Sequence, residues 1–196
     1  MTTTHKSAVM LAKAHGIALY GAKAVGLGEA ARKRLQVPAG VAVSADLVEA
    51  VASGDPRAIA RLDKAVAALA PPFAVRSSAL DEDGARASFA GQHLTVLNVH
   101  LAADVADAVR EVWWSANSDA AITYRQKVGL FARPRVGVVV QTLLDPEVAG
   151  VMFTENPISG AAERVIDASW GLGAAVVSGR VAILIGRVCT NEIDVV

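Results

Sequence analysis

The chain has 196 residues and 53% of them are apolar, which excludes intrinsic disorder. The 19 Lys and Arg residues balance 19 Asp and Glu residues, and this zero net charge argues against a general nucleic-acid-binding protein, which carries a basic excess. No apolar run reaches the roughly 18 residues of a membrane-spanning helix, and the single cysteine, Cys189, fits a reducing compartment, so we expect a cytoplasmic protein that binds no membrane.

Residues 21–72 predict helices with one short strand, whereas residues 7–20 are ambiguous. Residues 21–35 begin as a glycine-rich loop and continue as a helix with a basic end. Residues 37–43 predict a turn and a strand. A helix is expected from Ser44 to residue 52, because serine is a good N-cap. Asp55 and Pro56 predict a second helix start, with that helix running to residue 70.

The later elements are strands around a long helical segment. Residues 73–78 and 93–99 alternate as strands do, and a long polar loop separates them. Residues 102–128 predict one long helix, or two helices broken near Asn117. Residues 137–144 and 148–154 predict a β-hairpin, with residues 163–169 as a third strand nearby.

These elements predict an α+β fold in two lobes. The mixed N-terminal lobe is expected to cover residues 1–100. Residues 101–196 are expected to hold a helical connector and a second lobe that forms an antiparallel β meander.

Lys23 is the first candidate for ligand binding. Gly21, Gly26 and Gly28 surround it, and glycines let backbone N–H groups approach an anion closely. The spacing is not that of a P-loop, and the loose dinucleotide-binding pattern lacks its strand–helix–strand context. The alternative is a surface loop with a solvated lysine.

Arg76 is the second candidate, because it stands within an apolar strand. A buried arginine needs a partner, and its planar fork suits a phosphate or a carboxylate. The hydroxyls of Ser77 and Ser78 add possible donors. The alternative is a salt bridge from Arg76 to Asp81 or Asp83, which would close the polar loop.

Two further pairs of residues each have a structural and a functional interpretation. Trp113 is expected in the core, although the pair Trp113 and Trp114 also suits a docking patch. Glu192 and Asp194 are expected to be ordinary surface charges, with a metal-binding pair as the alternative.

Taken together, several segments carry a family resemblance. They read GAKAVGLGEA with VPAGVAV, then VRSSALDEDGARASFAGQHLTVLNV, then VVVQTLLDPEVAGVMFTENPISG with VIDASWGLGAAVVSGRV. In order and spacing they resemble the ATP-binding domain of the phosphoenolpyruvate-utilising phosphotransferases, over most of residues 18–181. That family includes phosphoenolpyruvate synthase, pyruvate phosphate dikinase and rifampicin phosphotransferase.

The resemblance implies an ATP-grasp fold that holds ATP between two lobes. It implies that Lys23 and Arg76 contact the ATP phosphates, with Arg76 as the catalytic cation. It also implies nucleotide contacts for Gly91, Thr95 and Gln141. In the family, ATP phosphorylates a carrier histidine on a separate swivelling domain.

Some parts of the family pattern are not found in this sequence. The resemblance places the Mg²⁺ ligands in an Asp-x-Glu pair downstream, so no metal ligand is predicted here, and none of the four histidines matches the carrier motif. The sequence also departs from the family pattern at Ala182, as a truncated or frameshifted product would. We therefore expect a chain that binds ATP for a carrier histidine on another domain or chain, with pyruvate, rifamycin or another compound as final acceptor. The alternative is a truncated, non-catalytic nucleotide-binding or assembly module.

Overall fold

The structure is a computed structural model that describes residues 7–80, 94–127, 129, 131–177, 184–189 and 192–195. The chain forms two compact units, Met1–Leu143 and Leu144–Val196. Both contain antiparallel sheets and helices, which confirms the α+β class. The division differs from the boundary expected at residue 100, because the helices and the strand that follow residue 101 complete the first unit.

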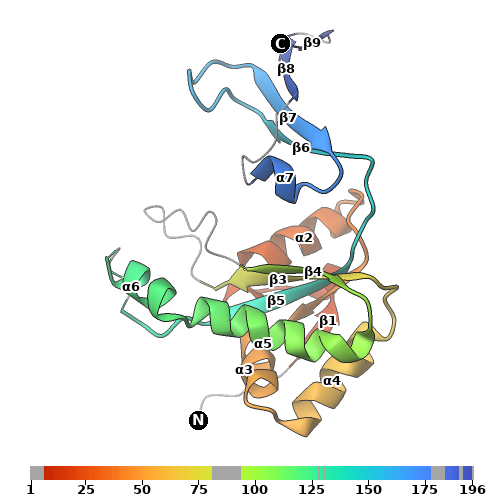
Figure 1. Ribbon diagram of the computed structural model, residues 1–196, viewed down its shortest axis with the longest axis vertical. Coiled ribbons are helices and arrows are strands. Elements are labelled where there is room, and N and C mark those ends of the chain that lie inside the picture. Colours follow the sequence, from red (N-terminus) through yellow and green to blue (C-terminus); the bar gives the residue numbers. More distant parts are fainter. Residues whose placement is uncertain are drawn as a thin grey trace. The chain divides into compact units, whose positions relative to one another are not determined.

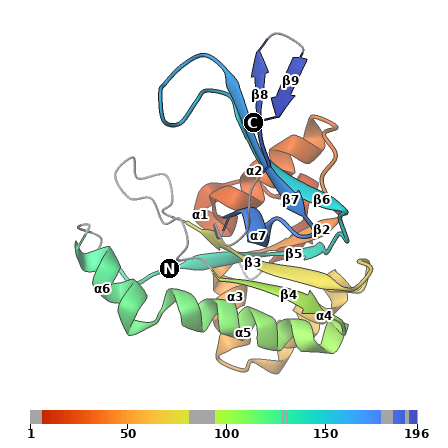
Figure 2. The same ribbon diagram turned by 45° about the horizontal axis from the view of Figure 1, so that its top comes forward.

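The first unit is built on a five-stranded antiparallel sheet in the order β1-β2-β5-β3-β4. Its strands are β1 (Ala8–Met10), β2 (Gly40–Val43), β3 (Phe73–Ala79), β4 (Thr95–Val99) and β5 (Val136–Thr142). Figure 2 shows β3 between β4 and β5. The two central strands, β5 and β3, are almost wholly buried, as expected for strands covered on both faces.

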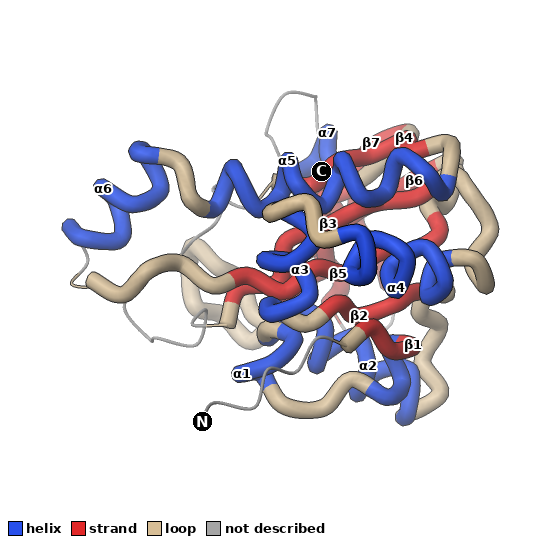
Figure 3. Tube along the Cα trace, turned by 90° about the horizontal axis from the view of Figure 1, so that it is seen from below, coloured by secondary structure: helices blue, strands red, loops and turns tan. Residues whose placement is uncertain are grey.

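Helices cover both faces of this sheet (Figure 1). The larger core lies under α3 (Ala45–Ala52), α4 (Pro56–Val66) and α5 (Val105–Ala116), and Figure 3 looks onto that face. The smaller core, on the opposite face, lies under the short 3₁₀ helix Leu11–Lys13, α1 (Ile17–Tyr20) and α2 (Ala22–Arg32). A second 3₁₀ turn, Ala102–Asp104, precedes α5, and α6 (Asp119–Lys127) follows it.

Several element boundaries follow from local sequence. Ser44 and Asp55 are the N-caps of α3 and α4, and Pro56 opens α4, as predicted. The helix α4 ends at Val66, four residues before the predicted end. The segment after residue 102 forms two helices with Asn117 as the C-cap of α5, so the broken alternative is the one observed.

The second unit is an antiparallel meander in the order β6-β7-β8-β9. Its elements are β6 (Val148–Phe153), β7 (Arg164–Trp170), α7 (Ala174–Val177), β8 (Leu184–Cys189) and β9 (Glu192–Val195). The meander was predicted, but the hairpin between residues 137–144 and 148–154 is wrong. The strand β5 pairs with β2 and β3 in the first unit, whereas β6 pairs with β7. None of the helices among the described residues combines the length and apolar character that a bilayer-spanning helix requires.

Replacing Ser44 by alanine is expected to destabilise the first unit by about 1–2 kcal/mol. The Ser44 hydroxyl is buried and accepts hydrogen bonds from the N–H groups of Leu47 at 3.4 Å and Ser7 at 2.9 Å, so the substitution leaves both donors without this acceptor. Urea denaturation measures the loss. Ser53→Ala, at the exposed end of the same helix, is the control and should change stability by less than about 0.5 kcal/mol. Equal losses for both variants would contradict the capping role.

Candidate functional site

Three residues from separate strands share one face of the first sheet. Arg76 on β3 pairs with Thr95 on β4 and with Val139 on β5. Gln141 lies two residues beyond Val139, so it projects from the same face. The sheet thus brings together Arg76, Thr95 and Gln141, which are far apart in sequence. This is the face on which α1 and α2 pack, through Val139 among others.

Gln141 is held at both ends of its amide group. Its Nε2 donates a hydrogen bond to the Pro38 carbonyl at 3.1 Å, and its Oε1 accepts one from Arg76 Nη1 at 3.3 Å. The residue is only 4% exposed, so its orientation is fixed by these bonds. Gly40, opposite Gln141 on β2, leaves the necessary room, because a Cβ there would stand 2.7 Å from Gln141 Cγ.

Arg76 is half-buried, and its partner among the described residues is a neutral amide. Burial lowers the pKa of the Arg76 guanidinium, since desolvation disfavours the charged form. The group still carries its charge at neutral pH, because arginine is not deprotonated in proteins. A guanidinium has five N–H donors, and one hydrogen bond to Gln141 leaves most of them available to an oxyanion. The alternative partners, Asp81 and Asp83, lie outside the described residues.

Lys23 lies beside the same strand. It is in the first turn of α2, half-buried, and its Nζ donates a hydrogen bond of 2.7 Å to the carbonyl of Ser77. Ser77 follows Arg76 directly in β3. Lys23 therefore contacts β3 at the residue next to Arg76, although the two cations come from separate segments of the sequence.

The predicted glycine-rich loop around Lys23 is wrong. The helix α2 begins at Ala22 and includes Gly26 and Gly28, so neither glycine lies in a loop. Gly28 instead permits close packing, since a Cβ there would stand 2.4 Å from the Leu11 carbonyl oxygen. The sequence suggested a loop because glycine disfavours helices, but tertiary packing overrides that preference.

Ser78 has a positioning role that the sequence did not indicate. Its hydroxyl, fully buried, accepts a hydrogen bond from the N–H of Ala24 at 3.0 Å. It caps α2 from another element, because Gly21, the N-cap of this helix, has no side chain to do so. This bond fixes the start of α2 against β3 and so fixes Lys23. The sequence predicts both Ser77 and Ser78 as ligand donors. The Ser78 hydroxyl instead caps α2, and Ser77 Oγ is buried without a hydrogen-bond partner among the described residues.

The structure describes only some of the remaining predicted residues. Thr95 is exposed beside Arg76 at the start of β4. Gly91 lies outside the described residues, as do the side chains of Glu192 and Asp194. Within the described part of the chain, no group of three or more His, Cys, Asp or Glu side chains gathers as metal ligands would.

Comparison with known proteins identifies the family of this chain. Residues 56–183, more than half of the chain, match the pyruvate phosphate dikinase AMP/ATP-binding domain family. The chain belongs to this family.

Individual relatives are similar over shorter stretches. The chain is 50% identical over 109 residues to a probable phosphoenolpyruvate synthase of Methanothermobacter thermautotrophicus, covering 55% of this chain and 16% of the relative. It is 41% identical over 143 residues to a rifampicin phosphotransferase of Streptomyces sviceus, covering 72% and 15%. It is 46% identical over 110 residues to the prodigiosin synthesizing transferase PigC of Serratia marcescens, covering 56% and 12%. The match therefore spans less than a fifth of the length of each of these relatives.

Proposed function

We propose that the face formed by Lys23, Arg76, Thr95 and Gln141 binds ATP and presents its transferable phosphoryl group to a histidine on another domain or chain. The proposal includes an ATP-grasp fold and a cytoplasmic location. The observation that carries it is Arg76: a half-buried guanidinium, oriented by Gln141, whose partner among the described residues is a neutral amide. A phosphate group would supply the charge that this environment lacks.

Each of the two cations is suited to a different phosphate group of ATP. The planar Arg76 fork suits two non-bridging oxygens of one phosphate, whereas the Lys23 ammonium acts as a point charge on another. Phosphoryl transfer depends mainly on positioning and on neutralising developing charge, and both cations serve these ends. Gln141 contributes by keeping the guanidinium from rotating away, since its own amide is tied to Pro38.

Thr95 and Gly91 are proposed as further nucleotide contacts. Thr95 is suited because its exposed hydroxyl lies beside Arg76 across the β3–β4 pairing. Mg²⁺ would neutralise part of the phosphate charge when bound. Because the described residues gather no cluster of metal-ligating side chains, its ligands are proposed to come from elsewhere and no step is assigned to it.

Calorimetry with ATP, in the presence and absence of Mg²⁺, tests the proposal. We expect micromolar binding by the chain. Arg76→Met and Lys23→Met, which remove the charge and keep most of the aliphatic stem, should each weaken it by about 1.5–3 kcal/mol, the range for hydrogen bonds to charged groups. That loss is about 10- to 150-fold in Kd.

The matched control is Lys64→Met, an exposed cation on α4, a helix that packs on the other face of the sheet. It should leave the affinity within about twofold, because an exposed charge at a distance is screened by salt. Unchanged affinity in a folded Arg76→Met variant would overturn the proposed site.

A further inference from the structure

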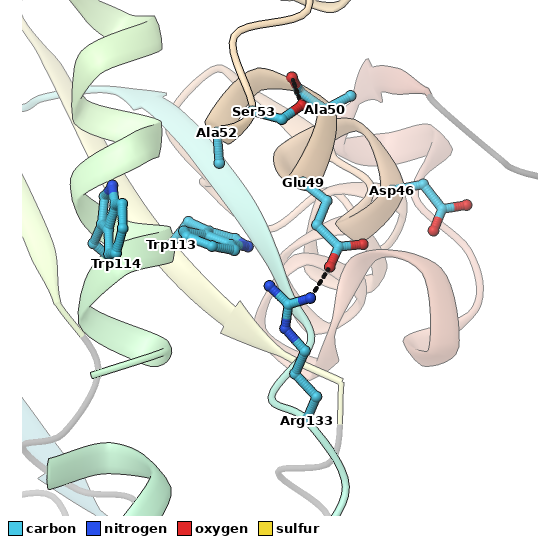
Figure 4. Close-up of a pocket in the computed structure, with 8 residues that line it drawn as sticks. All are labelled: Asp46, Glu49, Ala50, Ala52, Ser53, Trp113, Trp114 and Arg133. Atoms are coloured by element: carbon cyan, nitrogen blue, oxygen red, sulfur yellow. Dashed lines mark hydrogen bonds and ion pairs between the residues drawn. The ribbon is translucent and has the colours of Figure 1, made fainter. Parts of the chain in front are cut away.

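A pocket of about 500 Å³ opens between α3, α5 and the segment before β5 (Figure 4). It is lined by residues of all three segments: Asp46, Glu49, Ala50, Ala52, Ser53, Trp113, Trp114 and Arg133. Both helices pack on the sheet face opposite Arg76, so this pocket is separate from the proposed nucleotide site. Its volume is within the range of small-molecule sites.

Two tryptophan rings form one side of the pocket. Trp113 and Trp114 are consecutive on α5, with ring centroids 5.2 Å apart and planes at 83°. Trp113 is half-buried and packs against the core, as expected, whereas Trp114 is 64% exposed. An exposed tryptophan held edge-to-face by its neighbour is a rigid aromatic surface, which is typical of recognition sites.

A cation of the chain itself already lies in this pocket. The guanidinium carbon of Arg133 is 5.5 Å from the centre of the Trp113 ring, and an Arg133 nitrogen is 3.7 Å from a carboxylate oxygen of Glu49. This ion pair is longer than a hydrogen bond, and its side chains are 64% and 42% exposed. Such surface pairs contribute little stability, so another cation can displace Arg133.

We propose that this pocket binds an organic cation, a guanidinium or a substituted ammonium group. The aromatic faces of Trp113 and Trp114 would attract its charge, and Glu49 would be its counter-ion. Arg133 occupies this position in the structure and would compete with the bound cation. An anion is disfavoured here, because the faces of aromatic rings are negative and the Glu49 carboxylate lines the same pocket. The second carboxylate of the lining, Asp46, is already paired with Arg135.

The test uses N-acetylarginine amide as the probe and N-acetylcitrulline amide as its uncharged isostere. The readout is the indole N–H resonance of each of the three tryptophans, assigned with Trp→Phe variants. We expect saturable shifts for Trp113 and Trp114, the two tryptophans that line the pocket. The citrulline compound should bind at least tenfold more weakly. Equal binding of the two compounds would overturn the proposal.

Two substitutions separate a cation pocket from an anion pocket. Glu49→Gln should weaken binding of the arginine probe at least threefold. Arg133→Ala should strengthen it, because the internal competitor is removed. The pocket is an anion site, and the proposal is wrong, if Arg133→Ala instead abolishes binding of the arginine probe in a folded chain. The proposal is also wrong if inorganic phosphate shifts the same resonances in the parent chain but not in Arg133→Ala.

The source of the cation is tested with the same resonances. A Gly-Ser pentapeptide with a central arginine, bound at least tenfold more tightly than the amide, would identify the ligand as a side chain of a protein. Equal affinities would identify a free small cation. Both results support the cation pocket, and neither depends on ATP binding.

Discussion

Gly21→Ala is expected to destabilise the first unit by about 3 kcal/mol or more, the sum of a strained backbone and an overpacked contact. Gly21 has a φ of 81°, which L side chains rarely adopt, and a Cβ there would stand 2.2 Å from the Ser78 carbonyl oxygen. The strand β3 cannot move away to relieve the contact, because it pairs with β4 on one side and β5 on the other. Urea denaturation monitored by circular dichroism measures the loss.

The same substitution is expected to weaken ATP binding. The residue joins α1 to α2, and displacing the start of α2 would lengthen the bonds from Ala24 to Ser78 and from Lys23 to Ser77. Lys23 lies in the first turn of α2, so its position beside β3 depends on the close approach of Gly21 to Ser78. The calorimetric titration with ATP, run below the unfolding transition of the variant, checks this second effect.

Two glycines provide matched controls. Gly54 also has a φ of 81° but has no atom within 4 Å of an added Cβ, so Gly54→Ala should cost only the backbone strain, about 1–2 kcal/mol. Gly26, inside α2, also has open space, and Gly26→Ala should stabilise the chain by about 0.5–1 kcal/mol. A cost for Gly21→Ala no greater than that for Gly54→Ala would refute the packing argument.

The elements predicted most accurately from the sequence are those with a local cause. Ser44 and Asp55 cap their helices through their own side chains. Such features depend on interactions within a few residues, so the sequence pattern contains them.

The larger errors involve partners distant in sequence. The strand β5 precedes β6 as a hairpin strand would, and only its pairing with β2 and β3 places it in a different sheet. The helix α2 includes Gly28 because it approaches the Leu11 carbonyl closely, a requirement that no local pattern expresses. The boundary between the units depends on the same pairing of β5.

The sequence predicted only part of the candidate site, because some of its contacts also join residues that are distant in sequence. The arginine in an apolar strand signalled a polar contact on its own. The resemblance supplied Gln141, and the structure shows its physical role, since its amide connects Pro38 to Arg76. The capping role of Ser78 carried no signal in the sequence, because a serine that caps a helix from a distant strand looks like any serine in a strand.

Phe73→Ala is expected to cost about 3–5 kcal/mol of stability, the range for a fully buried phenylalanine. Phe73 is 1% exposed at the start of β3 and lies in the larger core. Its Cα is paired with Val99 on β4 and with Thr142 on β5, so truncating its side chain leaves a cavity where three strands meet. Since domains of this size are stable by about 5–15 kcal/mol, this loss is a large fraction of the total free energy of unfolding. The measurement is again urea denaturation.

Phe73→Leu provides a graded variant that keeps the core apolar and part of its volume, with an expected cost of about 1–2 kcal/mol. Its affinity for ATP should stay within about twofold of the parent chain, because Phe73 packs on the sheet face opposite Arg76 and Gln141. This separation distinguishes residues that maintain the fold from residues that bind. A loss of affinity in Phe73→Leu comparable to that of Arg76→Met would show that the site depends on the packing of the opposite core, and not only on the cations and the amide on its own face.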